Sequence, residues 1–515
     1  MHTRHIATST LWQLSSQGFT MVLGILSIKF VTIGLNQSLV GNYQTVWSYL
    51  QIFGILADFG LYAVAIRELS RAENRAVTLG SLFVLRALIT LISLSSALLL
   101  AFLIPQFTGT PLPLGIAIAI FVPFFTLLSG MFRTLFQVHY QMHLVFIAEV
   151  CAKIIPVCLL GIAILLGTRG SDNPHIFYIF NAFGDLGAIT LFIVSLWFAR
   201  PLLGHMGKVD KAELRPAGTP LLKVYPQFSR EEFKRLFRLA LPYGLAFLAT
   251  TLYRQSDVTL IALLRPDYDL QNAHYGTVLR LTEIGFLLPT FILNSALPHM
   301  SEQRERDLSS FLGSILLALL ILGSTISLFA FFFARPIVLL IANPSYLSTA
   351  FSPGSDTALM LMAFPMFLGM IISFCFYLLL HEHKWKPLLI LTSIAALLSI
   401  TLNMQLIPLF GFIGAAMTSI LIHLLLASGL LIVSLRFIKV SLPFKRLCQW
   451  FAFSLVFGLS LFFVLPFAVS ALSTILLGSC VLVGAIFLLS FLDLVPIHFH
   501  YFFGSGRNGM KVWDN

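Results

Sequence analysis

Long apolar stretches follow one another along almost the whole chain and are separated by short polar breaks that contain proline or glycine. A helix needs about 20 apolar residues to cross the hydrocarbon core of a bilayer, and it satisfies its own backbone hydrogen bonds there. The strands of a membrane barrel are shorter, about 10 residues, and alternate in polarity. The pattern therefore predicts an all-α polytopic membrane protein. Its helices are about fourteen in number, at residues 9–34, 41–66, 77–104, 112–132, 144–168, 174–199, 236–264, 272–300, 309–333, 353–380, 387–408, 411–435, 447–467 and 470–492.

Composition agrees with a surface that faces lipid. Of the 515 residues, 58% are hydrophobic and only 10% are charged, whereas a soluble protein carries about 25% charged residues. The start of the chain lacks a compact apolar stretch followed by a small-residue cleavage site, so we expect the first span to be retained. The cysteines all fall in apolar segments without a CxxC pair, so we expect neither disulfides nor a metal centre.

The net charge of +11 could indicate a nucleic-acid partner, but the placement of the basic residues gives a simpler explanation. If the N-terminus lies inside, the predicted outer loops hold only Arg169, Arg265 and Arg335, and most other Lys and Arg residues fall in inner segments. Basic residues accumulate on the cytoplasmic side of membrane proteins. We therefore expect a bacterial inner-membrane protein with both termini in the cytoplasm and no nucleic-acid partner.

A polar segment divides the chain into two halves. Residues 200–235 are rich in Pro, Gly and basic residues, and Ser229 and Glu232 form a capping box for the next helix. The sequence predicts an N-terminal lobe at 1–199, a cytoplasmic linker at 200–235, a C-terminal lobe at 236–437, and two further helices with a cytoplasmic tail at 438–515. GNYQTVWSYLQIF from Gly41 and AHYGTVLRLTEIG from Ala273 share Tyr, Thr, Val and Ile without a gap. The two lobes are therefore candidates for parallel repeats, a common plan in transporters.

Basic residues inside the predicted spans are the first candidates for a binding site. An ionisable side chain at bilayer depth costs about 2.5–3.5 kcal/mol, so it normally faces protein or a water-filled cavity. Lys29 and Arg86 have no partner in their own helices. Together with Arg254 and Arg280 they are candidate ligands of a substrate that bears phosphate.

Spacing suggests how other charges are used. Glu149 and Lys153 are four residues apart and can pair on one helix face. Asp58 and Asp185 are candidates for cation or proton coupling, although a hydrogen bond to a neighbouring helix explains each of them as well.

Two further pairs lie on adjacent spans of opposite direction. Arg254 and Asp257 are three residues apart, and so are Arg280 and Glu283. The four side chains can form one cluster, which either closes a gate or binds an anion. Asp257 and Glu283 are therefore also candidates for ion coupling or gating.

Four stretches, taken in order, resemble the polysaccharide transporter family of O-antigen and exopolysaccharide flippases in the MOP superfamily. They are SSQGFTMVLGILSIKFV with VGNYQTVWSYLQIFGILADFGLYAVAIREL, LFRLALPYGLAFLATTLYRQSDVTLIALL, YGTVLRLTEIGFLLPTFILNSALPHMSE, and the layout of the spans around a basic middle loop. The resemblance implies two six-helix lobes around a V-shaped cavity, with two additional C-terminal helices. It implies export of undecaprenyl-pyrophosphate-linked oligosaccharide by alternating access, driven by a proton or sodium gradient.

The resemblance also assigns roles to residues. Lys29, Arg254 and Arg280 fall on spans where such flippases place cavity cations, and Asp257 falls near an acidic position that resembles a cation site. Lipid II flippases carry several Arg residues in spans one and two, and this chain does not, which favours an oligosaccharide repeat unit as the substrate. Candidate partners are this lipid-linked oligosaccharide and polysaccharide polymerase or assembly proteins. No cofactor is expected apart from a coupling Na⁺ or H⁺.

Two other functions compete with transport of a glycolipid. A MATE-like exporter of drugs or cations would prefer acidic cavity residues and typically has twelve spans. An O-antigen polymerase or ligase usually carries a large periplasmic loop, and none is predicted here. No Walker A sequence is present, so ATP hydrolysis is not built in.

Overall fold

The computed structural model describes residues 2–61, 64–65, 68, 75–138, 141–201, 227–300, 305–382, 384–467 and 470–491. These residues are almost entirely helical and contain no β-sheet, only a single bridge between Leu35 and Ser171. The all-α prediction is confirmed. Residues 202–226 of the expected linker and 492–515 of the expected tail lie outside the described residues.

The helices follow the predicted order. The first half contains α1 (His2–Gly34), α2 (Gln37–Asp58), α4 (Arg75–Leu103), α5 (Leu112–Ala119), α6 (Phe121–Val138), α7 (Met142–Leu165) and α8 (Pro174–Ala199). The second half contains α9 (Arg230–Leu264), α10 (Tyr268–Met300), α11 (Glu305–Phe332), α12 (Ala334–Ile341), α13 (Ser355–His381), α14 (Trp385–Phe410) and α15 (Phe412–Phe437). The chain continues with α16 (Phe444–Val464) and α17 (Ala471–Phe491).

Eleven helical spans in the described part of the chain are long and apolar enough to cross a membrane. The chain is therefore a multi-pass membrane protein. The predicted spans 41–66, 272–300 and 470–492 coincide with α2, α10 and α17, which are not among the eleven. α2 and α10 carry many of the polar side chains that meet at the lobe boundary described below. The number fourteen stays a prediction.

Local sequence signals fix several helix ends. Asn36 accepts a hydrogen bond from the Leu39 N–H at the start of α2, and Asn173 accepts one from the His175 N–H at the start of α8. Ser229 accepts a hydrogen bond from the Glu232 N–H at the start of α9, as its capping box predicts. α2 ends at Phe59, which adopts the left-handed conformation with φ 46°.

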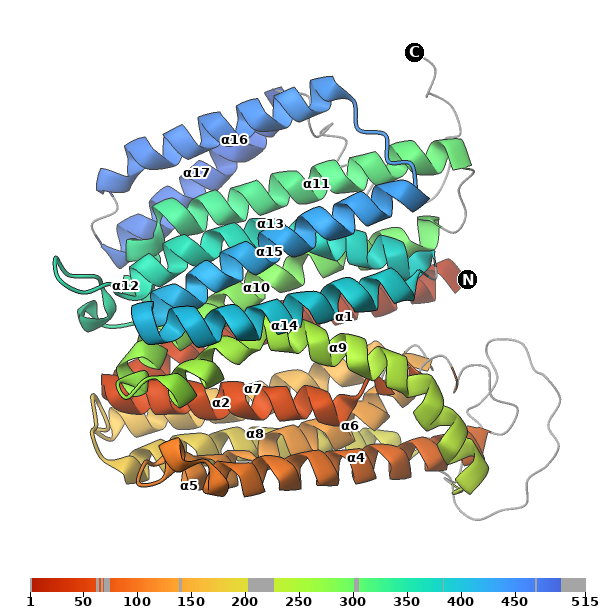
Figure 1. Ribbon diagram of the computed structural model, residues 1–515, viewed down its shortest axis with the longest axis vertical. Coiled ribbons are helices and arrows are strands. Elements are labelled where there is room, and N and C mark those ends of the chain that lie inside the picture. The colour runs from red at the N-terminus through yellow and green to blue at the C-terminus, as the bar shows by residue number, and fades with distance from the viewer. Residues whose placement is uncertain are drawn as a thin grey trace.

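Figure 1 shows α2, α4, α5, α6, α7 and α8 gathered in one lobe and α11, α13 and α15 in the other, with α16 and α17 beyond α11. The N-terminus and the start of α9 lie at one end of the bundle, and α12 lies at the opposite end (Figure 1). Following the predicted orientation, we call these the inner and the outer end.

The lobes share two buried regions. Val46 and Tyr49 of α2 belong to the same apolar cluster as Val278 of α10 and Met362 of α13. The first turns of α9 pack instead on the N-terminal lobe, where Leu236 joins a second cluster. α9 therefore connects the lobes within one continuous helix, and it contains Pro242 in its interior.

Candidate functional site

A polar seam joins α2 to α10 at the outer end. Its hydrogen bonds all cross from one lobe to the other: Ser38 Oγ to Asp269 Oδ2 at 2.5 Å, Tyr268 Oη to Asn42 Oδ1 at 2.9 Å, and Asn272 Nδ2 to Thr45 Oγ1 at 2.9 Å. Gln37 and His274 lie 3.1 Å apart at the same end. The two lobes are therefore closed against each other on this side.

Two glycines bring the helices of the seam into close approach. A Cβ atom at Gly41 would lie 1.6 Å from the Asp269 carbonyl oxygen. A Cβ atom at Gly276 would lie 2.6 Å from Gln44 Cβ. Only glycine permits this packing, since a larger residue at either position would force the helices apart.

Arg280 lies on the inner side of this seam. Its Nε donates a 2.7 Å hydrogen bond to Gln44 Oε1, and its guanidinium carbon lies 5.5 Å from the centre of the Trp47 ring. Both partners belong to α2, so Arg280 contacts the other lobe. Arg280 lies twelve residues after Tyr268, so it sits about 18 Å along α10, near mid-depth. Arg280 forms no ion pair with a carboxylate among the described residues.

Lys153 on α7 faces the same region from the N-terminal lobe. Its side chain is exposed and within electrostatic range of Arg280 and Glu283 on α10 and of Glu149 on its own helix. A side chain within electrostatic range of charges on the opposite lobe lies near the boundary between the lobes. Lys153 and Arg280 therefore carry like charges on opposite sides of this boundary, with the Glu149 and Glu283 carboxylates also in range of Lys153.

The expected four-residue cluster is not formed. Glu283 accepts a 3.4 Å hydrogen bond from Gln255, and the Arg254 guanidinium stacks 4.5 Å above the Phe286 ring. Phe286 in turn stacks on the buried ring of His423, which belongs to α15. Residues three apart share a helix face and could have paired with each other. Instead, aromatic rings and amide groups of other residues contact Arg254, Arg280 and Glu283.

Asp257, the fourth residue of the expected cluster, is 1% exposed. It accepts hydrogen bonds of 2.8 Å from Tyr275 Oη and 2.8 Å from Asn403 Nδ2. The other amide atom of Asn403, Oδ1, is buried and has no hydrogen-bond partner among the described residues. The Asp257 site is therefore a buried set of oxygen atoms inside the C-terminal lobe.

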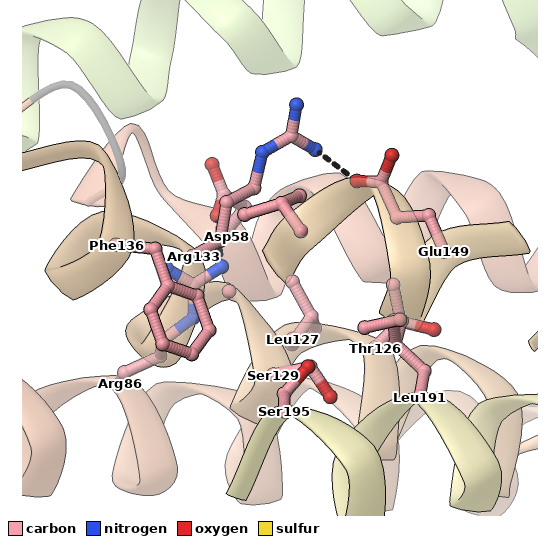
Figure 2. Close-up of a pocket in the computed structure, with 13 residues that line it drawn as sticks. Asp58, Arg86, Thr126, Leu127, Ser129, Arg133, Phe136, Glu149, Leu191 and Ser195 are labelled. Atoms are coloured by element: carbon pink, nitrogen blue, oxygen red, sulfur yellow. Dashed lines mark hydrogen bonds and ion pairs between the residues drawn. The ribbon is translucent and has the colours of Figure 1, made fainter. Parts of the chain in front are cut away.

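A second charged site lies within the N-terminal lobe, where a cavity of about 260 Å³ opens between α2, α4, α6, α7 and α8 (Figure 2). Arg86 and Asp58 form a 2.5 Å ion pair on its wall. Arg133 donates a 2.9 Å hydrogen bond to Glu149, which also accepts one from Ser16 Oγ. Figure 2 shows Arg133 and Glu149 meeting on the side that faces the green ribbon of the C-terminal lobe.

These contacts bear on the pairings that the sequence suggested. Asp58 pairs with Arg86 of the neighbouring helix, in line with the alternative given for Asp58. Glu149 forms its ion pair with Arg133 rather than with Lys153. Both ion pairs, Arg86 with Asp58 and Arg133 with Glu149, join residues of two neighbouring helices and not residues of one helix.

The remaining candidates lie apart. Lys29 is partly exposed toward the outer end of α1 and forms no ion pair among the described residues. Asp185 is 9% exposed, and its Oδ1 atom is buried without a hydrogen-bond partner among the described residues. The Tyr43 hydroxyl is within electrostatic range of both Asp185 and Arg280.

Sequence reasoning missed three residues of the site between the lobes. Lys153 was assigned to a pair within its helix, and Gln44 and Trp47 were not singled out. Gln44 and Trp47 are three residues apart and so share one face of α2. That spacing is a usable signal, but it identifies a site only once α10 is known to pack on that face.

Comparison with solved structures assigns the fold. The lipid II flippase MurJ in an inward closed conformation matches 93% of this chain and 98% of its own, with a TM-score of 0.66 and 15% identity. An inward-facing multidrug resistance MATE family transporter of the MOP superfamily matches 83% of this chain and 98% of its own, with a TM-score of 0.60 and 13% identity. An outward-facing MATE structure gives a TM-score of 0.57 at 14% identity, with 84% of this chain and 95% of its own covered.

Comparison of sequences gives the family. No curated protein sequence matched the chain. The family described as polysaccharide biosynthesis protein matches residues 6–304, which is more than half of the chain and includes the seam, Lys153 and Arg280. With its MurJ-like and MATE-like fold, the chain belongs to the polysaccharide biosynthesis protein family.

Proposed function

We propose that the protein is a flippase that moves an undecaprenyl-pyrophosphate-linked oligosaccharide, the repeat unit of an O-antigen, capsule or exopolysaccharide, across the membrane. The observation that carries the proposal is the like-charged pair of Lys153 and Arg280 between the lobes, near mid-depth. Arg280 forms no ion pair among the described residues, so a pyrophosphate that binds between the two cations would accept charge-assisted hydrogen bonds from both.

Alternating access follows from the same arrangement. The seam closes the outer end, so the bound headgroup would leave outward only after α2 and α10 separate. The α9 helix connects the lobes at the inner end and can bend at Pro242. The cycle then consists of two lobes that rock around one central site.

Ion coupling belongs to the C-terminal lobe in this proposal. Asp257 and Asn403 supply carboxylate and amide oxygens that suit Na⁺, and a proton on Asp257 would serve as well. Asp58, Asp185 and Glu283 stay candidates for coupling or gating. Asp58 already neutralises Arg86, which makes it the weaker candidate.

The location and partners follow from the substrate. The protein would act in the bacterial inner membrane with both termini in the cytoplasm, as the distribution of Lys and Arg predicts. It would receive the glycolipid from the inner leaflet and pass it to polysaccharide polymerase or assembly proteins. It would act as a transporter and not as an enzyme.

The proposal is tested by reconstituting the protein in vesicles with a fluorescent pyrophosphate-linked oligosaccharide and measuring how much reaches the opposite leaflet. Lys29→Ala and Arg280→Ala should each abolish glycan display in cells without loss of protein from the membrane. The Asp185 and Glu283 carboxylates also favour one alternative, a MATE-like exporter of cations. Transport of a cationic dye, with no movement of the glycolipid, would support that exporter and exclude the flippase.

A further inference from the structure

The Arg280 guanidinium can bind either its partners on α2 or a substrate phosphate, but not both at once. In the closed outer seam, its Nε donates to Gln44 and its face lies over Trp47, both on α2 of the opposite lobe. Under the proposed function, the same guanidinium binds the substrate pyrophosphate. We propose that Arg280 is a latch that holds the outer seam closed and that substrate phosphate releases. This inference rests on the proposed function for its releasing ligand, but the latch itself depends only on contacts within the protein.

The position of Arg280 suits a latch. Among the described hydrogen bonds between α2 and α10, the bond from Arg280 to Gln44 is the innermost, and the bonds of Ser38, Asn42 and Thr45 lie toward the outer end. Gln44 also packs where Gly276 has no side chain. A ligand that draws Arg280 away from Gln44 therefore disturbs the seam at the level of the close approach at Gly276.

The partners of Arg280 are weak enough to be exchanged. Gln44 is a neutral acceptor, and Trp47 offers only the face of its ring. A bidentate arginine–phosphate contact forms two hydrogen bonds between two ionised groups, whereas the contact with Gln44 is one hydrogen bond to a neutral acceptor. A phosphate that reaches Arg280 should therefore displace the amide.

Other arginines in the molecule show the contrast. Arg86, Arg133, Arg235 and Arg265 each form an ion pair with a carboxylate, at 2.5, 2.9, 2.7 and 2.8 Å. A phosphate would have to break an ion pair to recruit any of them. Arg280 lacks such a partner among the described residues, and Lys153 lies close enough to repel it. Binding an anion between Arg280 and Lys153 removes this repulsion at the same moment that it releases Gln44.

With this latch, the outer end opens only when substrate is bound. Without substrate, Arg280 stays on α2 and the outer end stays closed. With substrate, the seam loses its innermost contact and keeps only the bonds of Ser38, Asn42 and Thr45. Ligand and lobe separation are linked because the ligand binds the unlatched state more tightly.

The test is a distance measurement across the outer end in lipid nanodiscs. Spin labels are placed at Thr108→Cys and Ala350→Cys, two exposed loop positions in different lobes, after the native cysteines are replaced. The probe is geranylgeranyl pyrophosphate, with geranylgeraniol as the phosphate-free control. In the wild type the pyrophosphate should shift the distribution to longer distances and the alcohol should not.

Gln44→Leu separates the latch from the rest of the seam. It removes the acceptor and should raise the open population about tenfold without ligand, and the pyrophosphate should add little. The matched control is Ser38→Ala, which removes a seam hydrogen bond that does not involve Arg280. Ser38→Ala should open the seam in both conditions and keep the response to pyrophosphate.

The outcomes distinguish the latch from the proposed function. If Gln44→Leu shows the closed distances and the ligand response of the wild type, the latch is wrong and the flippase proposal stands. If the wild type neither binds nor responds to the pyrophosphate lipid, phosphate recognition at Arg280 is wrong, and substrate release of the latch is wrong with it. If Gln44→Leu still opens the outer end in that case, the contact between Arg280 and Gln44 holds the seam closed but does not respond to substrate.

Discussion

The Arg86 guanidinium on α4 lies 2.5 Å from the Asp58 carboxylate at the end of α2, so two charges from neighbouring helices form one ion pair. The Arg86 side chain is 4% exposed. Arg86→Ala leaves the Asp58 carboxylate, whose side chain is 30% exposed, without its ion-pair partner. Arg86→Ala should therefore lower the thermal unfolding temperature of the protein in detergent by several degrees.

The control for this prediction is Arg436→Ala, at an exposed arginine near the end of α15, which should change little. The double variant Asp58→Asn with Arg86→Gln should recover part of the loss, because both charges are then absent. Equal stability of Arg86→Ala and the wild type would show that the ion pair contributes nothing.

The close approach at Gly41 predicts a second effect. Gly41→Ala places a Cβ where the Asp269 carbonyl oxygen lies, so α2 and α10 must separate. We expect faster hydrogen–deuterium exchange in residues 37–46 and 268–276. Gly54→Ala lies on the same helix with its nearest neighbour at 3.7 Å, and should leave exchange unchanged. Unchanged exchange in Gly41→Ala would show that the seam tolerates a side chain there.

The Asp257 site predicts that one substitution uncouples transport from the ion gradient that drives it. Asp257→Asn keeps one acceptor oxygen, for Tyr275 or for Asn403, and removes the negative charge. We expect the variant to stay folded and to lose at least tenfold of the transport that an imposed Na⁺ or H⁺ gradient drives. Asp356→Asn, at a carboxylate that only caps Ser348, serves as the control. Full gradient-driven transport by Asp257→Asn would exclude this site from coupling.

The turn between α9 and α10 predicts a pH dependence of stability. Hydrogen bonding from Arg265 holds the pKa of Asp267 below its ordinary value, and Arg265 also donates to the Pro408 carbonyl on α14. A lowered folded-state pKa gives stability that is present above the unfolded value, about 3.9, and is lost as pH falls through the folded value. Asp267→Asn should lower the unfolding temperature at neutral pH.

The difference between this variant and the wild type should shrink when the unfolding temperatures are compared below about pH 3.5. Both proteins contain the same other carboxylates, so the difference isolates Asp267. A difference that stays constant with pH would mean that its ion pair with Arg265 does not stabilise the turn.

The architecture was predictable because its signals are local. Runs of apolar residues, Asn36 and Asn173 at helix starts and the capping box at Ser229 each specify an element without reference to distant residues. The full span count was harder, since α2 and α10 are polar where they face each other.

The site was predictable in its residue types but not in its partners. Arg280 was identified as a cavity cation, whereas its contacts Gln44 and Trp47 lie more than two hundred residues earlier in the chain. Spacing within a helix predicted pairs such as Glu149 with Lys153. Packing of α6 on α7 supplies Arg133 as the actual partner, and no single-helix pattern contains that information.

The central claim is that Lys153 and Arg280 together bind the pyrophosphate of a lipid-linked oligosaccharide between the lobes. The most direct measurement is the rate at which reconstituted Lys153→Ala, Arg280→Ala and the double variant move a fluorescent glycolipid between leaflets, with Lys386→Ala, at an exposed inner-end lysine, as the control. We predict a loss of at least about tenfold for each single variant, a less than additive loss for the double variant, and no loss for Lys386→Ala. Wild-type rates in the double variant, with the protein folded in the vesicles, would contradict the account.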